Sequence, residues 1–227
     1  MDMNTAIIPV SKLEDDCYDW WARHSQVLAE QGAIDPEIVL IGDSITHFWG
    51  GQPESETVHG EQKAWQSVFA GKRVLNLGFG WDRTQNVLWR LEHGQLVGLS
   101  PSWVVINIGT NNTSETANAR ANTAAEIRDA VRAICDRVQA EAPAARIVLM
   151  GVFPREEHPE HPTRKLISDI NVLYKQFAEE RNYVFLDIGS LMLDKDGILS
   201  REIAFDTCHL TEKGYNIWAD ALRRVLS

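Results

Sequence analysis

Residues 37–49 read EIVLIGDSITHFW, and this stretch decides the expected fold. Residues 38–41 are consecutive aliphatic side chains, mostly β-branched, with no polar residue alternating between them. That pattern is typical of a strand that is covered on both faces, as in a parallel sheet. The run ends in Gly42, Asp43 and Ser44, so the strand opens into a turn at the edge where open α/β sheets bind ligands. The stretch therefore predicts a parallel sheet with Ser44 at its functional edge, although GDS taken alone is more often a turn or a helix N-cap.

Apolar runs and helical periodicity alternate along the rest of the chain. After the first strand, the expected strands are residues 73–77, 103–108, 146–152 and 183–187. The expected helices are residues 11–31, a helix starting near 82 or 84, then 116–141, 164–181 and 211–226, and residues 50–60 are expected to form a loop. Five alternations without a break in composition predict one α/β domain over residues 1–227, with a doubly wound parallel sheet. Residues 1–36 are expected to pack on it as an N-terminal helical segment.

The composition limits the classes of partner. The formal charge of −10, from 22 basic and 32 acidic residues, argues against binding to nucleic acid or to an anionic membrane. No apolar stretch approaches the roughly 20 residues of a membrane span. Three cysteines without metal-ligand spacing favour a reducing compartment, and the first residues show no signal peptide. We therefore expect a cytoplasmic protein, although a secreted chain whose signal has been removed would look the same.

Four polar clusters follow expected strands, and these clusters carry the chemistry. They are GDS at 42–44, GFGWD at 78–82, GTNN at 109–112 and DTCH at 206–209, after the first, second, third and fifth strands. The carboxyl ends of parallel strands share one edge of the sheet, so the clusters should converge. A serine nucleophile needs a base and a group that orients this base, and His209 and Asp206 are candidates for these roles.

An oxyanion formed at such a serine needs fixed N–H donors. The candidates are the backbone N–H of Ser44, a backbone N–H in the turn at Gly80 and Trp81, and the side-chain amide of Asn111. The chain has neither a P-loop nor a GxSxG nucleophile elbow, which argues against those two enzyme classes. His158 and His161 lie among prolines without a suitable third ligand, so we expect no metal site.

Taken together, the blocks GDSI, GFGWD, GTNN and DTCHL resemble the SGNH (GDSL) hydrolases, over residues 37–226. The stretches NVLWRLEHGQL, INIGTNN and GVFPREEHP are similar to the platelet-activating-factor acetylhydrolase type of that family. The resemblance implies a three-layer α/β/α, flavodoxin-like fold with five parallel strands, and a serine esterase that needs no cofactor. It assigns Ser44 as nucleophile, His209 as base and Asp206 as the orienting acid. The implied oxyanion donors are the Ser44 amide, the turn amide and Asn111.

The chain departs from the family pattern at Trp81, where the family usually has a glycine before the aspartate of the second block. We expect this indole to shape the pocket, and we assign Asp43, Trp49 and Trp81 to substrate binding. The expected substrate is a small-molecule ester, and we favour an O-acetylated carbohydrate. A phospholipid acetylhydrolase and a non-catalytic binding module remain alternatives, and a homodimer, as in the family's animal members, stays open.

Overall fold

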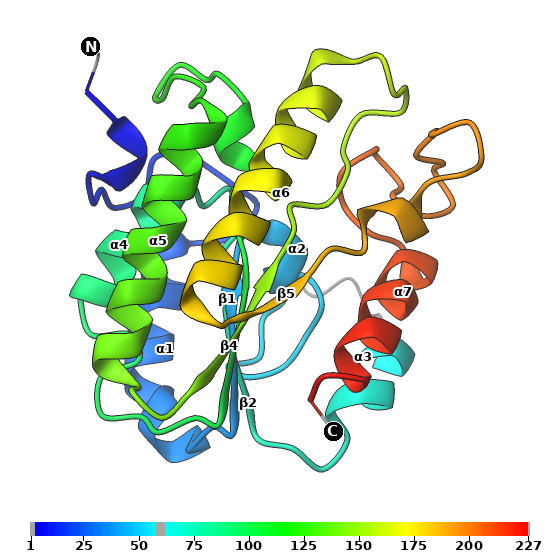
Figure 1. Cartoon of the computed structure of the whole chain (residues 1–227). Coiled ribbons are helices and arrows are strands. Elements are labelled where there is room, and N and C mark those ends of the chain that lie inside the picture. Colours follow the sequence, from blue (N-terminus) through cyan, green and yellow to red (C-terminus); the bar gives the residue numbers. More distant parts are fainter. Residues whose placement is uncertain (1–2, 58–61, 227) are drawn as a thin grey trace.

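Five parallel strands form the centre of the computed structural model, which describes residues 3–57 and 62–226 (Figure 1). The strands are β1 (Ile38–Gly42), β2 (Val74–Gly78), β3 (Trp103–Asn107), β4 (Arg146–Met150) and β5 (Val184–Leu186). Their order across the sheet is β2-β1-β3-β4-β5, and all four pairings are parallel. The chain thus starts at the middle of the sheet and winds outward in both directions, as the alternation of strands and helices predicts.

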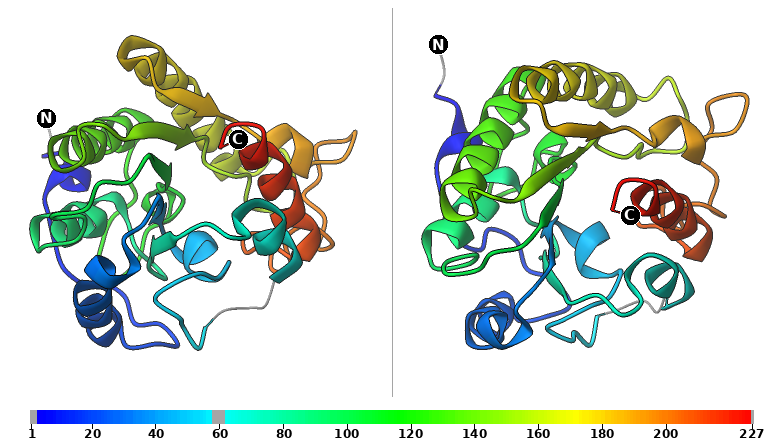
Figure 2. Two further views of the ribbon diagram at one scale, coloured as in Figure 1. Left: turned by 90° about the horizontal axis from the view of Figure 1, so that it is seen from below. Right: turned by 60° about the horizontal axis from the view of Figure 1, so that its bottom comes forward.

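Helices cover both faces of this sheet. The helices are α1 (Trp20–Ile34), α2 (Ser44–His47), α3 (Gln62–Phe69), α4 (Thr84–Glu92), α5 (Ala124–Glu141), α6 (Pro162–Arg181) and α7 (Glu212–Arg223). Val39 and Ile41 belong to the core beneath α1, α4, α5 and α6, whereas Ile38 and Leu40 belong to the core shared with α3 and α7 (Figures 1 and 2). Successive residues of a strand point to opposite faces, so an unbroken aliphatic run is needed to fill both cores. The predicted three-layer α/β/α architecture is confirmed.

Several helices begin at other residues than predicted, and capping side chains explain the differences. The first helix starts at Trp20, not at residue 11, because the Asp19 carboxylate accepts hydrogen bonds from the Trp21 and Ala22 amides. The helix expected from residue 116 starts at Ala124, where Thr123 and Glu126 form a capping box. Strand ends differ from the predicted ones by one or two residues, because inter-strand pairing and not side-chain polarity ends a strand.

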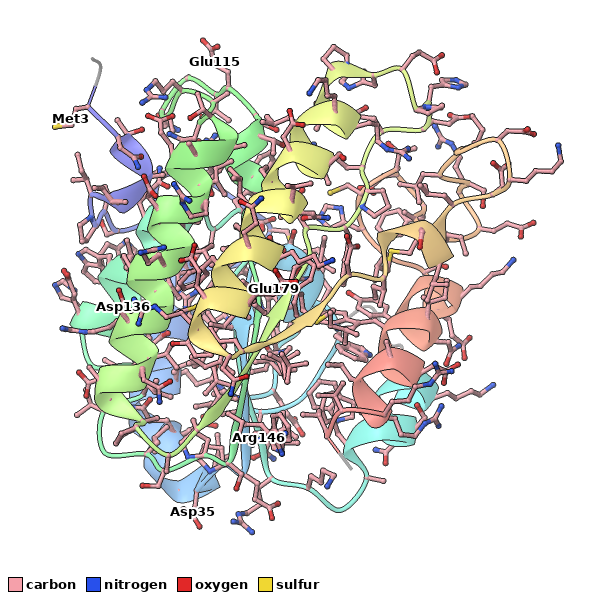
Figure 3. All side chains as sticks on the ribbon, viewed as in Figure 1. Met3, Asp35, Glu115, Asp136, Arg146 and Glu179 are labelled. Carbon is pink, nitrogen blue, oxygen red and sulfur yellow. The ribbon has the colours of Figure 1, made fainter. Side chains whose placement is uncertain are left out.

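The strand ends that precede the polar clusters lie at one edge. Gly42 of β1 is in register with Gly78 of β2 and Asn107 of β3. Figure 3 shows Glu115, on the loop after β3, at the top of the molecule. Asp35, just before β1, lies at the bottom, and Arg146, the first residue of β4, lies in the lower part.

Two glycines bring α2 onto this edge. A Cβ at Gly42 would lie 2.1 Å from the Thr46 hydroxyl, and a Cβ at Gly78 would lie 2.3 Å from the His47 nitrogen. Only glycine therefore allows the short helix that begins with Ser44 to sit directly against β1 and β2.

The N-terminal segment packs against α4 and α5. Thr84 donates a hydrogen bond from its hydroxyl to the carbonyl of Ala6, and Asn4 donates from its side chain to the carbonyl of Glu126. Trp20 is 3% exposed and belongs to the core beneath α1 and α4. None of the helices in the described part of the chain is long and apolar enough to cross a membrane.

Candidate active site

Ser44, His209 and Asp206 lie in hydrogen-bond contact. Ser44 is the first residue of α2, and the other two side chains come from the loop before α7. Ser44 Oγ lies 2.8 Å from His209 Nε2, and His209 Nδ1 lies 2.7 Å from Asp206 Oδ2. A carboxylate next to Nδ1 holds the proton on that nitrogen and leaves Nε2 free to accept the serine proton. The geometry is that of an activated serine hydroxyl.

The loop of residues 206–209 turns back so that one carboxylate contacts several donors. Asp206 Oδ1 accepts the backbone N–H of His209 at 2.7 Å and that of Cys208 at 3.1 Å. Thr207 adopts a left-handed φ of 66°, which is unfavourable for a β-branched residue and is typical of functional turns. Burial raises the pKa of Asp206, but the hydrogen bonds from His209 outweigh this effect and lower it overall. Asp206 is therefore held as an anion beside the imidazole.

Two backbone N–H groups and one side-chain amide are available as oxyanion donors. Asp43 caps α2 through the Ile45 amide, and no hydrogen bond within the described residues uses the N–H of Ser44 or of Trp81. Asn111 donates one N–H to the carbonyl of Asp82 at 3.0 Å, and its second N–H remains for another acceptor.

The predicted oxyanion donors included Gly80, and the structure corrects this assignment. Its N–H donates to His47 Nδ1 at 3.3 Å, so it is already engaged and Trp81 is left as the donor in this turn.

Trp81 takes a backbone conformation that favours glycine. Its φ is 61°, in the left-handed region, and the residue is 41% exposed. The indole is therefore exposed at the surface beside this turn, and its role in shaping the site stays a prediction.

A buried polar network lies behind the same turn, and sequence reasoning missed it. The Trp20 indole N–H donates to Asp82 Oδ1 at 2.8 Å, and Arg90 Nε–H donates to Asp82 Oδ2 at 2.7 Å. Burial raises the pKa of Asp82 to about 6, and the charge of Arg90 opposes this rise. Because the Asp82 carbonyl accepts a hydrogen bond from Asn111, the network also fixes the side chain of this candidate oxyanion donor. The only signal in the sequence is the place of Asp82 at the end of the second block.

The structure contradicts the assignment of Asp43 and Trp49 to substrate binding. Trp49 is fully buried, with its ring 4.3 Å from that of Trp218 and stacked also on Tyr215. Asp43 is 1% exposed and serves as the N-cap of α2, and burial raises its pKa to about 7. Both side chains belong to the interior, because the elements next to Ser44 pack against the sheet and α7.

Phe205 is a candidate site residue that sequence reasoning missed. It is 45% exposed, and its ring stacks on His209 with 5.9 Å between the ring centroids. Its position directly before Asp206 was the available signal.

The described residues contain no group of three or more His, Cys, Asp or Glu side chains that could hold a metal ion. Burial raises the pKa of the Cys208 thiol to about 12, so this neighbour of His209 is a neutral thiol at physiological pH. The hydroxyl of Ser44 is therefore the candidate nucleophile of this site.

Comparisons with known proteins show the family of this chain. The catalogue model of the GDSL-like lipase/acylhydrolase family matches residues 40–217. The human platelet-activating factor acetylhydrolase IB subunit alpha1 is 32% identical over 219 residues, covering 96% of this chain and 87% of the relative. The rat subunit alpha2 is 31% identical over 216 residues, covering 94% and 86%.

Solved structures show the same fold. A crystal structure described as a putative acylhydrolase from Bacteroides fragilis superposes with a TM-score of 0.71 at 22% identity, covering 94% of this chain and 98% of the other. A catalytic mutant of an acetylxylan esterase from Geobacillus stearothermophilus superposes with a TM-score of 0.66 at 23% identity, covering 83% and 93%. From the extent of the family match and the identity to the acetylhydrolase subunits, the chain belongs to the GDSL-like lipase/acylhydrolase family and is an esterase of that family.

Proposed function

We propose that this esterase removes acetyl groups from O-acetylated carbohydrates through an acyl-enzyme on Ser44. The observation that carries the proposal is the 2.8 Å contact between Ser44 Oγ and His209 Nε2, with Asp206 on the other ring nitrogen. A serine hydroxyl is a weak nucleophile unless a base takes its proton as it attacks, and this arrangement supplies the base.

The reaction follows from the positions of the donors and acceptors. Ser44 Oγ attacks the ester carbonyl while His209 Nε2 takes its proton, and the developing imidazolium is stabilised by Asp206. The amides of Ser44 and Trp81 and the free N–H of Asn111 stabilise the oxyanion. His209 then gives its proton to the departing alcohol, and a water molecule, activated by the same imidazole, hydrolyses the acyl-enzyme.

The proposal that the acyl group is acetyl is supported by the names of two similar proteins. One is an acetylhydrolase subunit, and the other is an acetylxylan esterase of the same fold. The carbohydrate is supported by the exposed aromatic side chains next to the triad. Trp81 projects from the oxyanion turn, and Phe205 stacks on His209. Flat apolar ring faces suit the apolar C–H faces of a sugar ring, and the indole N–H of Trp81 can donate a hydrogen bond to a sugar hydroxyl.

A second candidate is a phospholipid acetylhydrolase, and the 32% identity to the human acetylhydrolase subunit favours it. Both candidates release acetate from an ester and differ only in the alcohol. The net charge of −10 does not oppose a zwitterionic headgroup, so charge does not separate the two.

A substrate panel tests the proposal. We expect kcat/KM to be higher for acetylated xylo-oligosaccharides than for a phospholipid that carries an acetyl ester. We also expect Ser44→Ala to abolish turnover of both substrates and of p-nitrophenyl acetate. The matched control is Ser190→Ala, since Ser190 lies on the 3₁₀ turn of residues 189–192 after β5. Turnover retained by Ser44→Ala would refute the serine mechanism, and a preference for the phospholipid would reassign the substrate.

A further inference from the structure

His47 lies one helical turn after Ser44 and contacts the oxyanion turn. It is the last residue of α2 and is 1% exposed. Its Nδ1 accepts the backbone N–H of Gly80 at 3.3 Å, while its Nε2 lies 2.8 Å from the Ser55 hydroxyl and 3.0 Å from that of Thr57. A backbone N–H can only donate, so Nδ1 is unprotonated and the ring proton is on Nε2. His209 holds the opposite tautomer, with its proton on Nδ1 beside Asp206.

Gly80 is held from both sides. Its N–H donates to His47, and its carbonyl accepts the Tyr18 hydroxyl at 3.2 Å. The ring of Tyr18 packs edge-on against that of His47, with 4.6 Å between the centroids. We call His47 and Tyr18 the Gly80 clamp. The Gly80 carbonyl and the Trp81 N–H belong to one planar peptide unit, so the clamp also sets the direction of the Trp81 N–H.

We propose that His47 is a positioning residue for the oxyanion hole, an inference that rests on the proposed function. The helix that carries Ser44 also carries the acceptor that holds the opposite side of the hole. The nucleophile, its own amide and the Trp81 amide are thereby linked through one turn of helix and one hydrogen bond. Oxyanion donors act because they are fixed in place before the charge develops, so a turn free to rotate stabilises the transition state less.

Two substitutions of His47 separate this role from packing. His47→Asn keeps an oxygen acceptor at the place of Nδ1, whereas His47→Leu has a similar size to Asn and no acceptor. We expect His47→Leu to lower kcat for p-nitrophenyl acetate about tenfold or more with little change in KM, because a transition-state interaction is weakened. His47→Asn should keep kcat within about threefold of the wild type, because the asparagine oxygen still accepts the Gly80 N–H. His158→Leu, at an exposed histidine far along the chain, is the control and should leave kcat unchanged.

Several outcomes overturn the inference. Wild-type kcat in His47→Leu would show that the acceptor is unnecessary, and equal losses in the Asn and Leu variants would assign the effect to packing. If the Leu variant does not fold, nitrogen NMR of the wild type decides, since a His47 ring protonated on Nδ1 excludes the hydrogen bond from Gly80. Failure of the proposed function gives a different result. The wild type would then neither turn over p-nitrophenyl acetate nor be labelled on Ser44 by a fluorophosphonate, and this result would overturn both the proposed function and the role of His47.

Discussion

Replacing Asp43 by asparagine should change how stability depends on pH. The carboxyl group is 1% exposed, and its burial, opposed by the Ile45 amide, raises its pKa from 3.8 to about 7. At about 1.36 kcal/mol per pKa unit, the pKa difference between the folded and the unfolded protein corresponds to a destabilisation of about 4 kcal/mol when the carboxyl group is ionised. Between pH 3.8 and about 7 the folded protein keeps a proton that the unfolded chain releases, so the free energy of unfolding falls as pH rises through this window.

Asparagine mimics the protonated carboxyl and caps α2 equally well, so Asp43→Asn removes this dependence. We expect the two proteins to have similar free energies of urea unfolding near pH 4, and the variant to be more stable by about 2–4 kcal/mol near pH 8. Asp196→Asn, at an exposed carboxylate that forms an ion pair with Lys195, is the control and should keep the pH dependence of the wild type. A difference between wild type and Asp43→Asn that stays constant with pH, or a variant less stable near pH 8, would refute the reasoning.

Three further predictions concern Asn111 and the two tryptophans that flank polar clusters in the sequence. Asn111→Ala should lower kcat by about 10²–10³-fold with little change in KM, because its free N–H acts in the transition state; a loss confined to KM in steady-state kinetics would assign Asn111 to substrate binding. Trp81→Gly should leave the free energy of unfolding within about 1 kcal/mol of the wild type, since relief of the left-handed strain offsets the added freedom of the unfolded chain; a larger loss of thermal stability would show that the exposed indole packs. Trp49→Ala should cost about 3–5 kcal/mol of stability by urea unfolding, and a small cost would contradict the buried stack on Trp218.

The sequence alone determined the architecture, because a strand that is buried on both faces needs apolar side chains at successive positions. Residues 38–41 must be apolar at every position to fill both cores, and this requirement is visible without coordinates. The chain order of the polar clusters then placed Ser44, Asp206 and His209 at one edge, since parallel strands end together. Helix starts were less predictable, because a cap such as Asp19 depends on a few local hydrogen bonds.

Only the tertiary structure decided which tryptophan beside the polar clusters reaches the surface and which lies in the core. Trp49 and Trp81 both flank polar clusters in the sequence, yet Trp49 meets Trp218 from α7 in the interior while Trp81 projects outward from a left-handed turn. Likewise, the N–H of Gly80 was as good a donor as that of Trp81 until the ring of His47 was seen to accept it. The spacing of residues in the sequence predicts which side chains and amides reach the edge of the sheet. The direction in which each of them points is set by contacts with segments far away in the chain.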